Sequence, residues 1–157
     1  MGDVYKRQVN SLYIEPSVLE EVNSRLTRCY SEIAANEIKF ENYLCEDAEI
    51  VVVAYGTTAR IVKSAIALAR REHGIKVGLM RPITLWPFPE AALRALAERP
   101  QIKHFLAVEM STGQMVEDVR LSVENRKPVH FFGRTGGMVP TQREILSQVV
   151  RIAGGDK

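Results

Sequence analysis

Cysteine is scarce in this sequence, which has only Cys29 and Cys45 among its 157 residues. The two form no CxxC pair and lie in no cluster with histidine. An iron–sulfur cluster requires about four thiolates, and a structural zinc ion about four Cys or His ligands. The chain therefore cannot build either centre from its own cysteines. We expect both thiols to act as small apolar side chains in a reducing, cytoplasmic setting.

Long apolar runs and a charge of one sign are also missing. No stretch approaches the roughly 20 apolar residues of a membrane span, and the first ten residues have no apolar core of a secretory signal. The 21 Lys and Arg residues are interspersed with 19 Asp and Glu residues, for a net charge of +2. This pattern gives no support to a nucleic-acid or membrane partner. With 46% hydrophobic residues, the composition is typical of a globular domain.

A long amphipathic helix is the first element that the sequence predicts. Ser17 and Glu20 have the spacing of a capping box at its start. We expect this N-terminal helix over residues 13–40, as a strap over the next domain or as a lever to another one. Residues 1–12 lack periodicity and are expected to be a disordered or artificial lead-in. Apolar side chains recur every three or four residues, at Leu19, Val22, Leu26, Tyr30 and Ile33.

Beyond residue 48 the pattern changes to strands that alternate with helices. The β-branched run at residues 50–55 is apolar throughout, which predicts a central strand buried on both faces of a parallel sheet. Further strands are predicted at 75–80, 103–110 and 128–132, with the strand at 103–110 beside the central one. Residues 41–45 form either an edge strand or the tail of the first helix. The order predicts a three-layer α/β/α domain over residues 41–157, with a mostly parallel sheet of four to five strands.

The strand ends supply the candidate ligand and interface residues, because such sheets bind ligands beyond the carboxyl ends of their strands, near the switch point. We place that point between Gly56 and Glu109. Hydroxyls and amides after two of the strands either cap the following helix or hold a small anion. Arg134 either grips a carboxylate or phosphate or is a solvated loop side chain. The candidates are Gly56, Thr57, Thr58, Arg81, Trp86, Phe88, Glu109, Ser111, Thr112, Gly113, Gln114, Arg134, Thr135, Gly136 and Gly137.

None of these residues completes a recognisable active site. The sequence contains no P-loop, dinucleotide fingerprint or GxSxG elbow. Glu109 has no second carboxylate or histidine in a motif beside it, which favours a structural role over acid–base catalysis. His73, His104 and His130 stand at unrelated spacings. We therefore predict no catalytic residue and no metal site in this chain.

Four motifs in order carry a resemblance to a known family. They are AYGT at 54–57, RPITLWPFP at 81–89, VEMSTGQM at 108–115 and GRTGGMVP at 133–140. Together they closely resemble the C-terminal part of the α subunit of 2-oxoacid:ferredoxin oxidoreductases, of the 2-oxoglutarate and 2-oxoisovalerate types. The resemblance covers residues 13–153 and implies a transketolase C-terminal-like fold.

The resemblance implies a role within a larger enzyme. The whole enzymes decarboxylate a 2-oxoacid on Mg²⁺-bound thiamine diphosphate, reduce ferredoxin through iron–sulfur clusters and transfer the acyl group to coenzyme A. This chain has neither the Gly-Asp-Gly motif for the diphosphate nor the cluster cysteines. It is therefore expected to bind none of these cofactors alone, to be inactive in isolation and to serve assembly and active-site support.

The implied partners are the thiamine-binding domain of the same subunit and the partner subunits, with ferredoxin reached indirectly and a homodimer as a further option. We expect Trp86, Phe88 and Arg134 to border the docking surface, unless Trp86 plugs the core. One alternative function is a free-standing α/β module that binds a small anion. Another is the C-terminal domain of a thiamine-dependent dehydrogenase β subunit, against which the loop at 133–137 argues.

Overall fold

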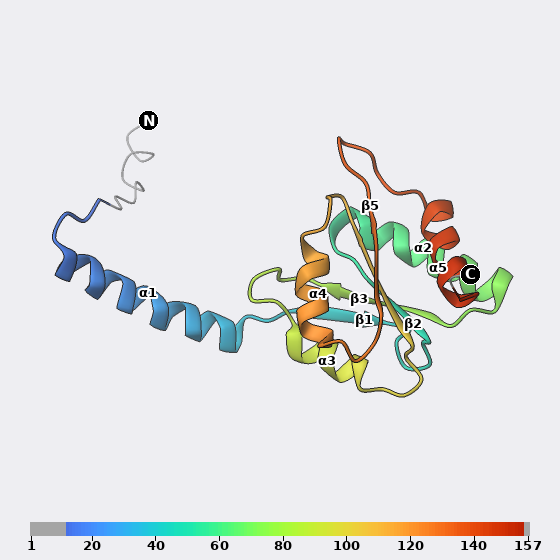
Figure 1. The fold of residues 1–157 in the computed structure, drawn as a ribbon, viewed down its shortest axis with the longest axis horizontal. Coiled ribbons are helices and arrows are strands. Elements are labelled where there is room, and N and C mark those ends of the chain that lie inside the picture. Colours follow the sequence, from blue (N-terminus) through green and yellow to red (C-terminus); the bar gives the residue numbers. More distant parts are fainter. Residues whose placement is uncertain (1–11, 156–157) are drawn as a thin grey trace. The chain divides into compact units, whose positions relative to one another are not determined.

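The computed structural model describes residues 12–155. Apart from Leu12, the predicted lead-in lies outside the described residues. The chain divides into two compact units, residues 1–36 and 37–157. In the described part of the first unit, α1 (Pro16–Asn36) is one continuous helix of 21 residues, which confirms the predicted long helix (Figure 1). The helix is shorter than the predicted range of 13–40, and residue 40 already begins a strand. Ser17 lies inside α1 rather than before it, so the predicted capping box is wrong.

The second unit contains a mostly parallel sheet with β2 at its centre, as predicted. The strand order is β1-β3-β2-β4-β5, and only β1 runs antiparallel to its neighbour, β3. The open alternative for residues 41–45 is thus resolved in favour of an edge strand. The strands are β1 (Phe40–Tyr43), β2 (Ile50–Val53), β3 (Val77–Pro82), β4 (His104–Glu109) and β5 (Val129–Gly133).

Two helices cover each face of this sheet, which gives the predicted three layers (Figure 1). Alternate side chains of β2 point to opposite faces, because successive residues of a strand do so. Val51 and Val53 join the core beneath one helix pair, whereas Ile50 and Val52 join the core beneath the other. The pairs are α3 (Glu90–Ala97) with α4 (Met115–Val123), and α2 (Gly56–His73) with α5 (Gln142–Ala153).

The chain enters the sheet where β3 ends. Phe40 is in register with Pro82, and the Lys39 carbonyl accepts hydrogen bonds from the amides of Ile83 (2.9 Å) and Thr84 (3.1 Å). Because β1 is antiparallel to β3, its first residue lies at the carboxyl edge of the parallel strands. This edge also carries the candidate residues.

The two cysteines differ in their surroundings. Cys45 is buried, and its Sγ lies 3.3 Å from the Leu79 carbonyl oxygen. Burial raises the pKa of the Cys45 thiol to about 11, so the thiol stays protonated at neutral pH and serves as the predicted apolar filler. Cys29 lies exposed on α1, so the same prediction is wrong for Cys29.

Candidate functional site

The candidate residues gather at the carboxyl edge of the sheet. The chain crosses from β3 to β4 past β2, so the topological switch point lies between β2 and β4, as predicted. Gly56 opens α2 directly after β2, and Glu109 is the last residue of β4. The segments that follow β3 and β5 flank this point at the same edge.

Glu109 is a buried carboxylate that holds the start of α4. Its Oε2 accepts hydrogen bonds from the Ser111 hydroxyl (2.9 Å) and from the amides of Gln114 (3.1 Å) and Met115 (3.0 Å). Its Oε1 accepts from the Val116 amide (3.1 Å). These are the amides that an external anion would use at a helix N-terminus. Glu109 thus replaces such an anion, and the arrangement supports the structural role rather than acid–base catalysis.

The rest of the loop before α4 is folded around this carboxylate. The Ser111 hydroxyl also accepts a hydrogen bond from the Gly113 amide (3.1 Å), while Thr112 is exposed. Burial raises the pKa of Asp118 on α4, and the negative charges of Glu90 and Glu109 add to this effect. The environment next to α4 is therefore already acidic, which disfavours an anionic ligand here.

The start of α2 is built differently from the prediction. Tyr55 occupies the N-cap position and its side chain makes no capping hydrogen bond. Thr58 is buried and donates its hydroxyl to the Tyr55 carbonyl (2.6 Å), while Thr57 is exposed. The expectation that these threonines cap α2 is therefore wrong. Gly56 has a φ of 56°, a left-handed conformation that favours glycine.

A basic hollow lies beside the first turn of α2. Its volume is about 370 Å³, and Arg60, which the sequence reasoning did not single out, contributes to it. The Lys63 ammonium and the Arg81 guanidinium lie 2.6 Å and 3.3 Å from the carboxylate of Glu41. The hydrogen bond from Lys63 lowers the pKa of Glu41. Lys63 and Arg81 thus share Glu41 as a partner, and its single negative charge offsets one of the three positive charges. The lining residues are Gly56, Thr57, Ala59, Arg60, Lys63 and Arg81.

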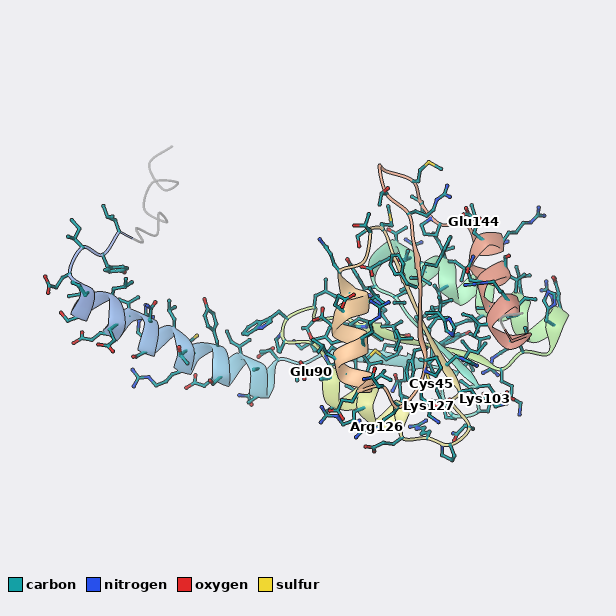
Figure 2. The ribbon with its side chains drawn as sticks, in the orientation of Figure 1. Cys45, Glu90, Lys103, Arg126, Lys127 and Glu144 are labelled. Atoms are coloured by element: carbon teal, nitrogen blue, oxygen red, sulfur yellow. The ribbon has the colours of Figure 1, made fainter. Side chains whose placement is uncertain are left out.

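Arg134 is held by the next helix. Its amide donates to the Glu109 carbonyl (3.2 Å), and its guanidinium lies 3.2 Å from the Glu144 carboxylate. Glu144 lies on α5, where Figure 2 labels it. Glu144 also completes the predicted capping box with Thr141. The hydrogen bonds from the backbone and side chain of Thr141 lower the pKa of Glu144. Arg134 therefore has an internal partner and is not a solvated loop side chain.

The tip of the loop after β5 is exposed. Thr135, Gly136 and Gly137 lie at the surface, and both glycines have positive φ values, of 63° and 81°. The Thr135 carbonyl accepts a hydrogen bond from the Met138 amide (3.1 Å). This loop combines a fixed base at Arg134 with an exposed tip, which suits contact with another surface.

Exposed apolar side chains surround the strand ends. Trp86 is 60% exposed, so it is no core plug, whereas Phe88 is only 9% exposed and packs in the core with α3 and α4. We therefore withdraw Phe88 as a docking residue. Most of the exposed apolar residues were not among the residues predicted from the sequence. Their position in Gly- and Pro-rich loops could have indicated them. We call the following residues the strand-end apolar group: Ile83, Leu85, Trp86, Met110, Met138 and Val139.

Comparison with known proteins assigns this architecture to a family. Residues 48–145 match the model of the pyruvate:ferredoxin oxidoreductase core domain II. The chain belongs to this family. All four motifs at the strand ends lie within the matched range, and the resemblance drawn from them is confirmed.

Curated relatives of the chain are subunits of 2-oxoacid oxidoreductases. It is 44% identical to the ketoisovalerate oxidoreductase subunit VorB of Methanothermobacter marburgensis over 152 residues, which cover 97% of this chain and 42% of the relative. It is 38% identical to the 2-oxoglutarate synthase subunit KorA of Methanothermobacter thermautotrophicus over 109 residues, 69% of this chain and 28% of that one. The chain thus spans less than half the length of these relatives. The match to VorB includes α1, which lies outside the family model.

Solved structures support the fold. One is a 2-oxoglutarate:ferredoxin oxidoreductase from Magnetococcus marinus, with a TM-score of 0.71 and 21% identity over 88% of this chain and 24% of that one. Another is a split-gene transketolase, with a TM-score of 0.61 and 18% identity over 72% of this chain and 40% of that one. The transketolase-like fold implied by the motifs is therefore confirmed.

The described residues form no metal centre. Within residues 12–155, no three or more His, Cys, Asp or Glu side chains form a group that could hold a metal ion. His104 and His130 lie 3.3 Å apart between Nδ1 and Nε2, on β4 and β5, without a third such ligand. In the same part of the chain, no helix has both the length and the apolar character needed to cross a membrane.

Proposed function

We propose that this chain is the C-terminal part of a thiamine-diphosphate-dependent 2-oxoacid:ferredoxin oxidoreductase α subunit. The observation that carries the proposal is the 44% identity to VorB over 97% of the chain. The activity of such an enzyme is oxidative decarboxylation of a 2-oxoacid to acyl-CoA with reduction of ferredoxin. Its setting is cytoplasmic.

In this proposal the chain serves assembly and active-site support rather than chemistry. Glu109 is committed to α4 and Arg134 to Glu144, so the charged groups of the strand ends already have internal partners. The strand-end apolar group, by contrast, offers exposed Trp86 and its neighbours to another protein. Aromatic and methionine side chains are enriched at such interfaces. The proposed partners are the thiamine-binding domain and the other subunits, and those parts carry thiamine diphosphate, Mg²⁺, iron–sulfur clusters and coenzyme A.

The anion-binding module has weaker support. Glu109 occupies the N-terminus of α4, and in the basic hollow Lys63 and Arg81 are both paired with Glu41. An external anion would therefore compete with Glu41 for two of the three cations.

A chimeric subunit tests the proposal. The segment of Methanothermobacter marburgensis VorB that matches this chain is replaced by this chain, and the chimera is produced with the other subunits of that enzyme. We expect the complex to form and to reduce a viologen dye in response to a 2-oxoacid and coenzyme A. VorB without the segment is the control and should fail to assemble. A folded chimera that neither assembles nor supports dye reduction would overturn the proposal.

A further inference from the structure

We propose that α1 pairs with α1 of a second copy of this chain, as a short antiparallel coiled coil. The proposal does not depend on the oxidoreductase function. It concerns the first unit alone and draws on the burial, spacing and charge of the residues of α1.

The first observation is that α1 has a row of apolar side chains along one side, here called the seam, and that none of them is buried. No residue of its 21 is buried, although the helix is continuous over roughly 30 Å (Figure 1). Helices of this length owe most of their stability to packing of an apolar face, so α1 requires a partner for that face. The seam repeats at intervals of three and four residues, as the a and d positions of a coiled coil do, at Leu19, Val22, Leu26, Cys29 and Ile33.

The other side of α1 needs no partner. The hydroxyls of Thr27 and Ser31 donate to the carbonyls of Asn23 and Thr27, each at 2.9 Å. Such bonds satisfy these side chains within the helix itself. Ser24 and Ser31 occupy the heptad position farthest from the seam. The partner is therefore expected on one face only, and that face is apolar.

Charge selects a second copy as the occupant and the antiparallel orientation. Arg25 and Glu32 stand at equivalent positions beside the seam, seven residues apart. If Leu26 of one copy lies opposite Cys29 of the second copy, Arg25 of each copy faces Glu32 of the other, which gives two ion pairs. A shift by one heptad places Arg25 opposite Arg25, or Glu32 opposite Glu32. A parallel pair places Arg25 opposite Tyr30, which gives no ion pair. Only one arrangement is complementary, and flanking charges set the partner and direction of coiled coils.

Sedimentation equilibrium of the full chain tests the pairing. We expect a concentration-dependent dimer in the micromolar range. Leu26→Asp should weaken dimerisation by at least about tenfold, whereas Ser24→Asp, which adds the same charge on the opposite face, should leave it unchanged. A wild-type chain that stays monomeric, or a dimer that tolerates Leu26→Asp, would overturn the proposal. So would a monomer whose melting temperature falls with Leu26→Asp, because the seam would then pack against its own chain.

Charge reversal and cross-linking test the direction. Arg25→Glu should weaken the dimer, and the double variant Arg25→Glu, Glu32→Arg should restore it. Under mild oxidation, Leu26→Cys should form a disulfide with Cys29 of the second copy, since the two face each other in the proposed register. The variant Leu26→Cys, Cys29→Ser is the matched control and should not cross-link. A wild-type dimer linked through Cys29 of both copies would show a parallel pair and contradict the proposal.

Discussion

At the scale of single residues, Glu109 shows how a carboxylate at a strand end can be structural. Three backbone amides and one hydroxyl donate to its two oxygens, at 2.9 to 3.1 Å. The first turn of an α-helix leaves its amides without partners inside the helix. Glu109 supplies those partners from β4, and it also places a negative charge at the positive end of the α4 dipole. The residue therefore joins a strand to the helix that follows it.

We expect Glu109→Gln to destabilise the chain by about 2–4 kcal/mol, because a buried charged hydrogen-bond acceptor is lost and one amide meets another donor. Urea unfolding monitored by circular dichroism measures the change. Glu117→Gln is the control, since Glu117 lies exposed on the same helix and pairs with Arg120. Equal effects of the two substitutions would show that the Glu109 carboxylate is not what holds α4.

At the scale of elements, close approach of the chain at Gly133 locks the loop before α4 to the end of β5. A Cβ atom at Gly133 would lie 2.3 Å from the Ser111 carbonyl oxygen and 2.4 Å from the Phe131 ring. The Arg134 amide then donates to the Glu109 carbonyl. Two strand ends are thus fixed together, which gives the candidate site a rigid base.

Gly133→Ala should cost about 1–3 kcal/mol, the range of overpacked sites, because backbone must move to admit the methyl group. The same substitution at Gly154 is the control. A Cβ there would lie 3.4 Å from its nearest atom, with φ at −76°, so Gly154→Ala should change stability by less than about 0.5 kcal/mol. Thermal unfolding of both variants checks this contrast. Similar melting temperatures for the two would contradict the packing described for β5.

Sequence reasoning recovered the elements better than the side-chain directions. The central strand was predictable because residues 50–53 are apolar on both faces, as burial between two helix layers demands. The exposures of Trp86 and Phe88 could not be predicted, because the sequence does not distinguish two aromatic residues so close together. Only the packing against α3 and α4 buries Phe88 and leaves Trp86 exposed. The structural role of Glu109 followed from its lack of catalytic partners. The groups that donate hydrogen bonds to Glu109 could not be predicted, because the turn between β4 and α4 brings them to the carboxylate.

At the scale of the whole molecule, the strand-end apolar group is the surface best suited to the proposed assembly. Truncation of exposed Trp86 should leave the fold intact, because surface substitutions rarely change stability by more than about 0.5 kcal/mol. In the chimeric complex, Trp86→Ala should weaken assembly by about tenfold or more, as loss of an interface hot spot does. Gel filtration of the complex and thermal unfolding of the free chain measure the two effects.

Leu121→Ala provides the matched control. Leu121 is 74% exposed on α4 and belongs to no strand end, so its truncation should affect neither measurement. If both variants assemble equally well, Trp86 does not contribute to docking. If Trp86→Ala lowers the melting temperature of the free chain, its role is internal.

The antiparallel direction of β1 has a consequence for how binding events combine. The chain enters the second unit at the edge that holds Ile83 and Thr84, beside the strand-end apolar group. Only residues 37–39 separate α1 from β1, and three residues span at most about 10 Å. A tether this short keeps the second unit of each copy close to the paired helices, and sites linked in this way have effective concentrations in the millimolar range. Pairing of α1 with a second copy would therefore hold two strand-end apolar groups together, so a partner with two docking sites would bind the pair more tightly than a single copy.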